Sequence, residues 1–246
     1  MTDEPFHIFG ADRAARWVVT CDHATNRVPE EICGGSLGID AADMARHIAY
    51  DVGAAGVALG LAERLRAPAV LSNFSRLVID PNRGEDDPTL VMKLYDGTII
   101  PANRAVDAAE TERRLDAYHR PYHRAVAGLL AGRPAPILVA VHSFTPQFRG
   151  RPPRPWHVSV LHTADRRLAD PLLARLRREH GLVVGANEPY TGALAGDSID
   201  RHATAHGRPN ALVEVRNDLI SDDTGQDEWA ERLARCLDEA LADADL

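Results

Sequence analysis

The stretch RWVVTCDH, residues 16–23, joins an apolar segment to a polar turn. A short apolar run rich in β-branched residues is typical of a buried strand. This run ends on Cys21-Asp22-His23, and a small-residue loop follows directly. Because α/β proteins bind ligands beyond the carboxyl ends of their strands, we expect His23 to lie at a sheet edge where a site can form.

Further segments of the same kind recur along the chain. Most lack strict alternation of apolar and polar residues, as expected when helices cover both faces of a sheet. The predicted strands are APAVLSNFS (67–75) continuing into RLVID (76–80), APILVAVHSF (135–144), WHVSVLHT (156–163), GLVVGAN (181–187) and NALVEVRND (210–218).

Helical patterns separate these strands. We expect helices over residues 40–66, 105–131 with an interruption or tightening near Pro121, 166–181 ending at Gly181, and 227–244. Residues 84–98 and 148–155 have the composition of loops, and we expect them near the face that carries the functional site. Strands alternating with helices predict one α/β domain over residues 1–246, a three-layer α/β/α sandwich with a mixed, mostly parallel sheet.

Composition restricts the class of protein. The 246 residues carry a formal net charge of −8, so no basic excess is present to bind nucleic acid. No apolar run approaches the roughly 20 residues of a membrane span, and the acidic N-terminus lacks an apolar signal core. The three cysteines form neither a metal-ligand pattern nor an even disulfide framework. We expect a cytoplasmic protein with neither nucleic-acid nor membrane partners.

Two histidines follow apolar strands directly, His23 in WVVTCDH and His142 in ILVAVH. Two neutral imidazoles with a carboxylate and an open position suit a catalytic zinc ion. Asp51 is the candidate carboxylate, and His47 is a competing ligand because a spacing of four residues would place both on one helical face. The alternative is that each histidine is a structural residue with satisfied hydrogen bonds.

Polar residues cluster in SRLVIDPNRGEDD, where a predicted strand ends at Pro81. The planar guanidinium of arginine binds carboxylates bidentately, and asparagine offers both a donor and an acceptor. Arg76, Asn82 and Arg83 are therefore candidates for binding an acidic substrate. The alternative is a turn held by an Asp–Arg salt bridge.

Glu214 lies between two valines in the apolar segment NALVEVRND. A charge in such a run must be paired or functional if it faces the interior. Strand alternation places Leu212, Glu214 and Arg216 on one face. Glu214 is the candidate general base, Arg216 a candidate substrate contact, and His202 in the preceding loop a candidate catalytic partner. The alternative is an edge strand with a solvated polar face.

The segment YHRPYHRAV contains His119, Tyr122 and His123. The two histidines have a helical spacing, but the intervening glutamate of the metalloprotease motif is missing, so we assign the three residues a structural or substrate-contacting role. The chain has no G-x-S-x-G elbow and no phosphate-binding glycine loop, which disfavours a serine nucleophile and a nucleotide site.

Seven sequence blocks follow one another over residues 17–220: CDHATNRVPEE, HIAYDVGA, SRLVIDPNR, YHRPYH, VHSFTP, NEPYTG and DRHATAHGRPNALVEVRNDLI. Together they resemble the N-formylglutamate amidohydrolase family. The resemblance implies a fold similar to zinc-dependent exopeptidases and aspartoacylase-like deacylases. It also implies His23 and His142 as metal ligands, Glu214 as the catalytic carboxylate and DPNR as the substrate-carboxylate site.

The sequence departs from related patterns at two places. Asn26 stands where the exopeptidase-type pattern has a glutamate, so Asp51 is chosen as the remaining ligand by its position. The first block reads Asp22-His23-Ala24-Thr25, whereas the enzymes of histidine degradation have a Pro-His-x-Gly pattern. This second departure indicates a divergent branch of the family.

These features predict an amidohydrolase that uses one Zn²⁺ ion to remove an N-acyl group, first of all formyl, from an acidic amino acid such as N-formylglutamate. Glu214 would act as the base, Arg76 or His202 would stabilise the oxyanion, and Asn82 and Arg83 would bind the substrate carboxylate. The expected assembly is a monomer or small homo-oligomer. Alternatives are an amidase for a larger carboxylated amide or peptide, and a metal-free protein that binds an acidic metabolite.

Overall fold

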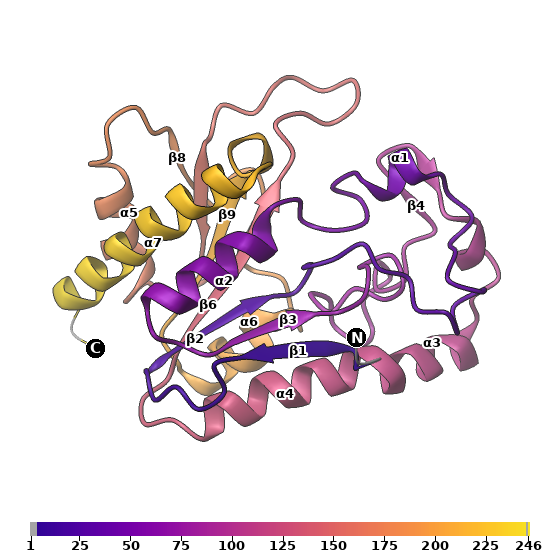
Figure 1. Ribbon diagram of the computed structural model, residues 1–246, viewed down its shortest axis with the longest axis horizontal. Helices are drawn as coiled ribbons and strands as arrows, with labels where there is room; N and C mark the ends of the chain where they lie inside the picture. Colours follow the sequence, from indigo (N-terminus) through magenta and orange to yellow (C-terminus); the bar gives the residue numbers. More distant parts are fainter. Residues whose placement is uncertain (1–3, 245) are drawn as a thin grey trace.

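A seven-stranded sheet forms the centre of the computed structural model, which describes residues 4–244 and 246 (Figure 1). The strands run in the order β1-β3-β2-β6-β9-β7-β8. Their bounds are β1 Phe6–Phe9, β2 Trp17–Cys21, β3 Ala69–Ser72, β6 Ile137–Phe144, β7 Val158–Leu161, β8 Val184–Ala186 and β9 Asn210–Arg216.

The sheet is mixed and mostly parallel, as predicted. Strands β3, β2, β6 and β9 are parallel neighbours, whereas β1 is antiparallel to β3 and β7 is antiparallel to β9. The carboxyl ends of the four parallel strands therefore meet at one edge. In the centre of the sheet, His142 on β6 lies opposite Glu214 on β9.

Helices cover both faces of the sheet, which confirms the predicted three layers. One core joins the sheet to α2 (Ala54–Arg64), α5 (Ala169–Leu176) and α7 (Asp223–Asp243). The other face packs on α4 (Arg120–Ala131) and α6 (Ser198–His202), with α4 running along the opposite side of the sheet from α2 and α7 (Figure 1). No helix within the described residues is both long and apolar enough to span a membrane.

Smaller elements surround this sandwich and complete the loops. The helix predicted for residues 105–131 forms, but it widens into a π-helix over Leu115–His119 just before Pro121, a residue that removes one backbone donor. The others are α1 Ala41–Met44, α3 Ala108–Arg114, the hairpin β4 Leu94–Tyr95 and β5 Thr98–Ile99, and 3₁₀ turns at Pro101–Asn103, Thr204–His206 and Asn217–Leu219.

The single helix predicted over residues 40–66 is wrong. Helix α1 ends at Met44 and α2 begins at Ala54, and residues 45–53 form turns between them. Gly53 has φ of +79°, a left-handed conformation that prevents the helix from extending toward α1. His47 and Asp51 therefore do not share a helical face.

Other boundaries also differ from the predictions, among them the ends of β3 and α5. The strand expected to continue through residues 76–80 ends at Ser72, because Ser75 instead donates to the carbonyl of Ala49 and accepts from the amide of Leu77. Such local side-chain bonds compete with a strand ladder. Helix α5 ends at Leu176, five residues before the Gly181 that was expected to cap it.

We expect Gly53→Ala to destabilise the fold. A Cβ atom at this position would collide with the carbonyl oxygen of Ile220, and alanine disfavours the left-handed conformation. The free energy of unfolding should fall by about 1–3 kcal/mol, measured by urea denaturation. Gly128→Ala, at an exposed position of α4, is the control, because nothing lies within 4 Å of its added Cβ. It should be neutral or stabilising, and an equal loss in both variants would contradict this account.

Candidate active site

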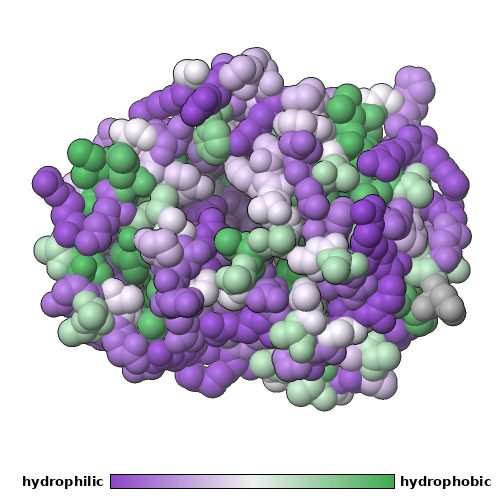
Figure 2. Space-filling model, turned by 180° about the vertical axis from the view of Figure 1, so that it is seen from behind, coloured by the Kyte–Doolittle hydropathy of each residue, from purple (hydrophilic) through white to green (hydrophobic). Residues whose placement is uncertain are grey.

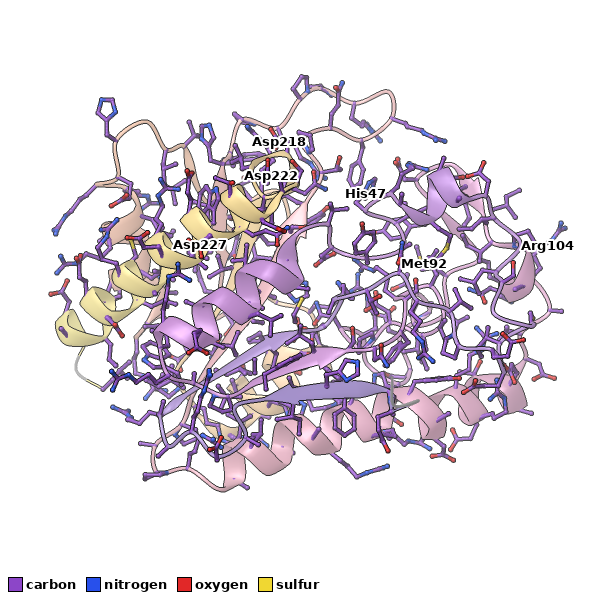
Figure 3. The ribbon with its side chains drawn as sticks, in the orientation of Figure 1. His47, Met92, Arg104, Asp218, Asp222 and Asp227 are labelled. Carbon is purple, nitrogen blue, oxygen red and sulfur yellow. The ribbon has the colours of Figure 1, made fainter. Side chains whose placement is uncertain are left out.

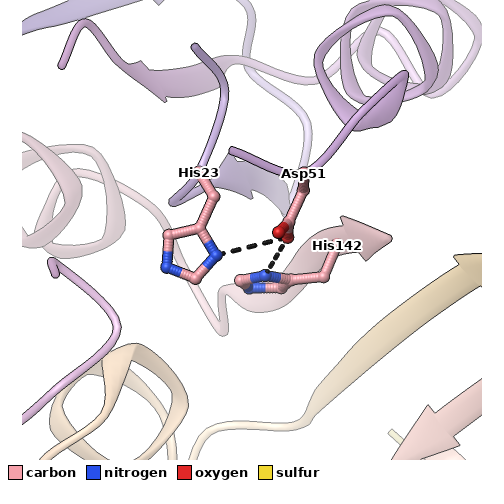
Figure 4. Close-up of side chains that lie close together, drawn as sticks. All are labelled: His23, Asp51 and His142. Atoms are coloured by element: carbon pink, nitrogen blue, oxygen red, sulfur yellow. Dashed lines mark hydrogen bonds and ion pairs between the residues drawn. The ribbon is translucent and has the colours of Figure 1, made fainter. Parts of the chain in front are cut away.

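Three buried side chains converge at the carboxyl edge of the sheet: His23, Asp51 and His142 (Figure 4). Nδ1 of His23 lies 3.2 Å from Oδ2 of Asp51, and Nδ1 of His142 lies 2.8 Å from the same oxygen. Each residue offers one possible ligand atom, and these three atoms lie within 4.8 Å of one another. The three side chains could therefore hold a metal ion, as the strand-end positions of the histidines predict.

Local structure brings these residues together from three parts of the chain. His23 follows β2 and His142 belongs to β6, and these two strands are parallel neighbours. The turn of residues 45–53 is bound to both, since the amide of Asp51 donates to the carbonyl of His23 and the amide of Ser143 donates to Asp51 Oδ2. Asp51 is thus fixed between the two strand ends.

Each histidine is also held on its far side by a carboxylate. Nε2 of His23 lies 2.7 Å from Oδ1 of Asp80, and Nε2 of His142 lies 3.0 Å from Oδ2 of Asp22. If Nε2 carries the proton and donates it to the carboxylate, each Nδ1 presents a lone pair to the cluster. This carboxylate–histidine arrangement is the usual way in which proteins orient metal-binding imidazoles.

The charges of the cluster suit a divalent cation. Asp22, Asp51 and Asp80 are buried, and Arg76 is the one guanidinium bonded to them among the described residues. Burial opposes ionisation, but the hydrogen bond from His142 lowers the pKa of Asp22 to about 2. Three carboxylates against one guanidinium leave two negative charges, which one divalent ion would balance with both histidines neutral. The residues present therefore fit a zinc ion.

Arg76 is committed to the carboxylates of this cluster. Its Nε and Nη2 donate to Oδ2 of Asp80 at 3.1 and 2.8 Å, and its Nη1 lies 3.4 Å from Oδ1 of Asp51. Its guanidinium also stacks on the ring of Tyr95. Arg76 lines the cavity described below, but its donors mainly hold two carboxylates in place.

Asp22 has two further partners in the helical layer beneath the sheet. The hydroxyls of Tyr122 on α4 and Ser198 on α6 donate to its Oδ1 at 2.6 and 2.9 Å. Tyr122 is fully buried and does not line the cavity, so its role is structural. The sequence predicts none of these bonds, although an aspartate directly before a strand-end histidine is a signal that could have indicated Asp22.

A cavity of about 390 Å³ opens beside the cluster. The surface seen in Figure 2 is hydrophilic over most of its area and is hollowed near its centre. The lining of the cavity is mixed. The polar residues include His23, Asp51, Arg76, Asn82, Arg83, His142, Asp197 and Glu214, and the apolar and aromatic residues include Phe144, Leu161, Tyr190, Leu194 and Leu212.

Glu214 is the one side chain of this cavity wall that has a buried oxygen without a hydrogen-bond partner among the described residues. Burial raises the pKa of Glu214 to about 7. Its strand β9 lies between β6 and β7, so the alternative of a solvated edge strand is wrong. An unpaired carboxyl that faces a cavity and titrates near neutrality can accept and return a proton.

Asn82 and Arg83 present free donors to the cavity. Asn82 Oδ1 accepts the amide of Ser198 at 3.2 Å, which leaves its Nδ2 without a partner among the described residues. The Nε of Arg83 donates to the hydroxyl of Thr89, and its Nη1 donates to the carbonyl oxygen of Asn82. Its Nη2, like Nδ2 of Asn82, has no hydrogen-bond partner among the described residues. Nε2 of His119 lies 3.0 Å from the carbonyl oxygen of Arg83 and holds the backbone.

Two predicted site residues do not line this cavity. Arg216 ends β9 and forms an ion pair with Asp218, 2.7 Å away. His202 lies in α6, not in a loop as expected, and its Nε2 is 2.8 Å from Nδ1 of His123. Burial lowers the pKa of His202 to about 4, so it is neutral at pH 7.

The competing ligand His47 also lies outside the metal-ligand group. Its Nε2 is 3.6 Å from Oδ2 of Asp96, and its ring packs against Phe148 and Tyr95. Of the two ligands considered from the sequence, the structure brings Asp51 to the histidines.

Buried side chains that could hold a metal ion, beside an unpaired carboxyl at the edge of a three-layer α/β sheet, are the arrangement of a metal-dependent hydrolase site. The family model for N-formylglutamate amidohydrolase matches residues 15–221, and the chain belongs to this family. The predicted family and amidohydrolase class are thereby confirmed. No curated protein matches the sequence.

Solved structures share the fold over almost the whole chain. The gene product Atu2144 from Agrobacterium tumefaciens is 33% identical, with a TM-score of 0.91 over 98% of this chain and 96% of that chain. N-formylglutamate amidohydrolase from Ralstonia eutropha JMP134 is 21% identical, with a TM-score of 0.68 over 98% and 99% of the two chains. A bacteriophage poly-gamma-glutamate hydrolase, 11% identical, has a TM-score of 0.50 over 98% and 92%.

We expect the isolated protein to bind one zinc ion, and Asp22→Asn to weaken that binding about 10–100-fold. Asparagine keeps the shape of Asp22 but supplies no negative charge to the Nε2 of His142. Competition with a zinc-binding dye would measure the affinity. Asp197→Asn is the control, since Asp197 lines the cavity without bonding either histidine, and equal losses in both variants would contradict the assignment.

Proposed function

We propose that this protein is a zinc-dependent amidohydrolase that removes an N-acyl group from an acidic amino acid, with N-formylglutamate as one substrate of this class. The observation that supports it best is the convergence of both histidine Nδ1 atoms on one oxygen of Asp51, beside the unpaired carboxyl of Glu214. The family supplies the reaction class, amide hydrolysis. The three free thiols fit a reducing cytoplasm.

His23, Asp51 and His142 would hold the ion. Bound there, zinc would supply Lewis acidity and bring the pKa of water toward neutrality. Glu214 removes the proton from the attacking water and returns it to the leaving nitrogen. The hydrogen bonds from the histidines to Asp22 and Asp80 keep the imidazole rings in a single orientation throughout this cycle.

Asn82 Nδ2 and Arg83 Nη2 would bind the carboxylate of the substrate. Both groups face the cavity without a protein partner in the described part of the chain, and an arginine–carboxylate bond is strong when water is excluded. Arg76 acts as a positioning residue for Asp51 and Asp80. A metal-free binding protein would gain nothing from a buried, unpaired Glu214, whereas a hydrolase needs such a base.

The direct test is a deacylation screen of the zinc-loaded protein over N-formyl and N-acetyl derivatives of glutamate and aspartate. We expect release of the free amino acid, abolished by a chelator and restored by zinc. Zinc bound stoichiometrically without turnover of any N-acyl acidic amino acid would contradict the proposed function.

We expect Glu214→Gln to lower kcat by about 10²-fold or more while the protein keeps its zinc, because glutamine preserves shape but accepts no proton. In the wild type, kcat/KM should fall as the pH drops through the pKa of Glu214, since only the ionised carboxyl is a base. Burial raises that pKa to about 7, and the charge of a nearby metal ion would move it downward.

The same pH profile in Glu214→Gln provides the check. Its acidic limb should disappear or move. Near-normal kcat in this variant would place the base elsewhere, and loss of zinc would make Glu214 a ligand.

We expect Arg83→Ala mainly to raise KM for a carboxylate substrate, because this contact is present in both the ground state and the transition state. An uncharged amide analogue of the substrate should be hydrolysed nearly equally by wild type and variant. Equal losses with both substrates would indicate that Arg83 stabilises its turn through Thr89 and not the substrate.

A further inference from the structure

A second hollow, of about 340 Å³, adjoins the cavity of the candidate active site. The two share His47 and Thr145 as lining residues. His47 and Asp218, both labelled in Figure 3, belong to the rim of this second hollow. On the acyl side of the scissile bond, a formyl group has only one carbon atom. N-formylglutamate would therefore leave the second hollow filled with water.

The two hollows lie toward opposite helical layers. In the first, Asn82 is bonded to Ser198 at the start of α6, and the carbonyl of Arg83 is bonded to His119, next to α4. The second is lined by Val52, which precedes α2, and by Asn217 and Ser221 between β9 and α7. His23, Asp51 and His142 line the first hollow at the sheet edge, and His47 and Thr145 join this hollow to the second.

This order fixes which part of a substrate can reach the second hollow. If the carboxylate is bound by Asn82 and Arg83, the scissile amide lies at the sheet edge near Glu214. The chain beyond that amide, which is the acyl group, then continues past His47 and Thr145. The second hollow therefore faces the acyl side of the scissile bond.

Most charged groups of the second hollow are already paired. Arg46 donates to Asp43 and Asp96, and Asp218 is paired with Arg216 outside the hollow. Arg149 differs, because its side chain is 62% exposed and its one ion-pair contact among the described residues, with Asp43, is 3.5 Å long.

Three neutral polar side chains of the second hollow form no hydrogen bonds within the described chain. Nε2 of His47 is buried without a hydrogen-bond partner, 3.6 Å from Oδ2 of Asp96, and the side chains of Asn217 and of the exposed Ser221 also line the hollow. Burial lowers the pKa of His47 to about 4, so its imidazole is neutral at pH 7 and can donate or accept. Neutral donors and acceptors in a groove complement the N–H and C=O groups of a peptide.

We infer that the second hollow is a subsite for a peptide-like acyl group, so that the preferred substrates are acidic amino acids whose nitrogen carries an aminoacyl or short peptidyl chain. This inference rests on the proposed function. In the reaction, water adds to the acyl carbon, the bond from that carbon to the glutamate nitrogen breaks, and Glu214 passes the water proton to that nitrogen. The products are a free carboxylate and a free amino acid.

The test compares N-acetylglycyl-L-glutamate with N-formyl-L-glutamate on the zinc-loaded protein. We expect kcat/KM to be at least about tenfold higher for the acetylglycyl substrate. Ser221→Trp places a large ring in the second hollow and should lower the ratio of the two kcat/KM values at least about tenfold. Ser221→Ala is the matched control and should change the ratio much less, because it leaves the space open.

A wild-type preference for N-formylglutamate, or an unchanged ratio in Ser221→Trp, overturns the inference. A general folding defect lowers both kcat/KM values and leaves their ratio unchanged, so the ratio reports the hollow itself.

Calorimetric titration of the Glu214→Gln protein with both compounds separates this inference from the proposed function. If the wild type hydrolyses neither these two compounds nor any other N-acyl acidic amino acid of the screen, the proposed function is wrong, and the binding data still decide on the subsite. Tighter binding of the acetylglycyl compound that Ser221→Trp removes supports the subsite. Equal affinity for the two compounds overturns it.

Discussion

The oxygen Oδ2 of Asp51 is shared by the Nδ1 atoms of His23 and His142, and the arrangement of the site depends on this shared contact. It ties a turn to the ends of two parallel strands. Because both Nδ1 atoms face inward, both Nε2 atoms must face outward, where buried carboxylates accept their protons. Those carboxylates in turn need Arg76, Tyr122 and Ser198.

Because the network is buried, each of its carboxylates needs a hydrogen-bond or ion-pair partner. A carboxylate in the low-dielectric interior is stable only when it is hydrogen-bonded or paired with a charge. Each polar group that serves as its partner is buried too and needs hydrogen-bond partners of its own. The exception is Glu214, whose carboxyl has an oxygen without a hydrogen-bond partner among the described residues and whose pKa is raised by burial. The contrast between three satisfied aspartates and one unsatisfied glutamate separates groups that hold geometry from a group that can exchange a proton.

Much of this could be predicted from the sequence, because apolar runs reveal strands and polar residues at their ends reveal a sheet edge. His23, His142 and Glu214 were found in this way, as was the mixed three-layer fold. The bonds to Asp22 and Asp80 could not be predicted, since they join residues 120 and 57 positions apart. Strand alternation placed Arg216 on the face of Glu214, but it could not show that the strand has passed the cavity by residue 216.

The boundary errors have a similar origin. The small residues of 40–66 favour a helix locally, but the backbone of Ile220 approaches Gly53 and requires a left-handed turn there. That contact comes from a residue far along the chain, so no local pattern contains it. The same turn carries Asp51, and an uninterrupted helix would not bring this carboxylate to both strand ends.

Strand β9 is the last strand in the chain, yet it lies inside the sheet between β6 and β7. During synthesis, β6 and β7 are both made before the strand that separates them. Until β9 inserts, β6 lacks a neighbour on that side and the two halves of the sheet are not joined. The carboxyl of Glu214 arrives with this final insertion, so the base takes its place only when the sheet closes. A chain that lacked β9 would therefore still contain all three metal-ligand residues, His23, Asp51 and His142, but would have no Glu214 to accept the proton.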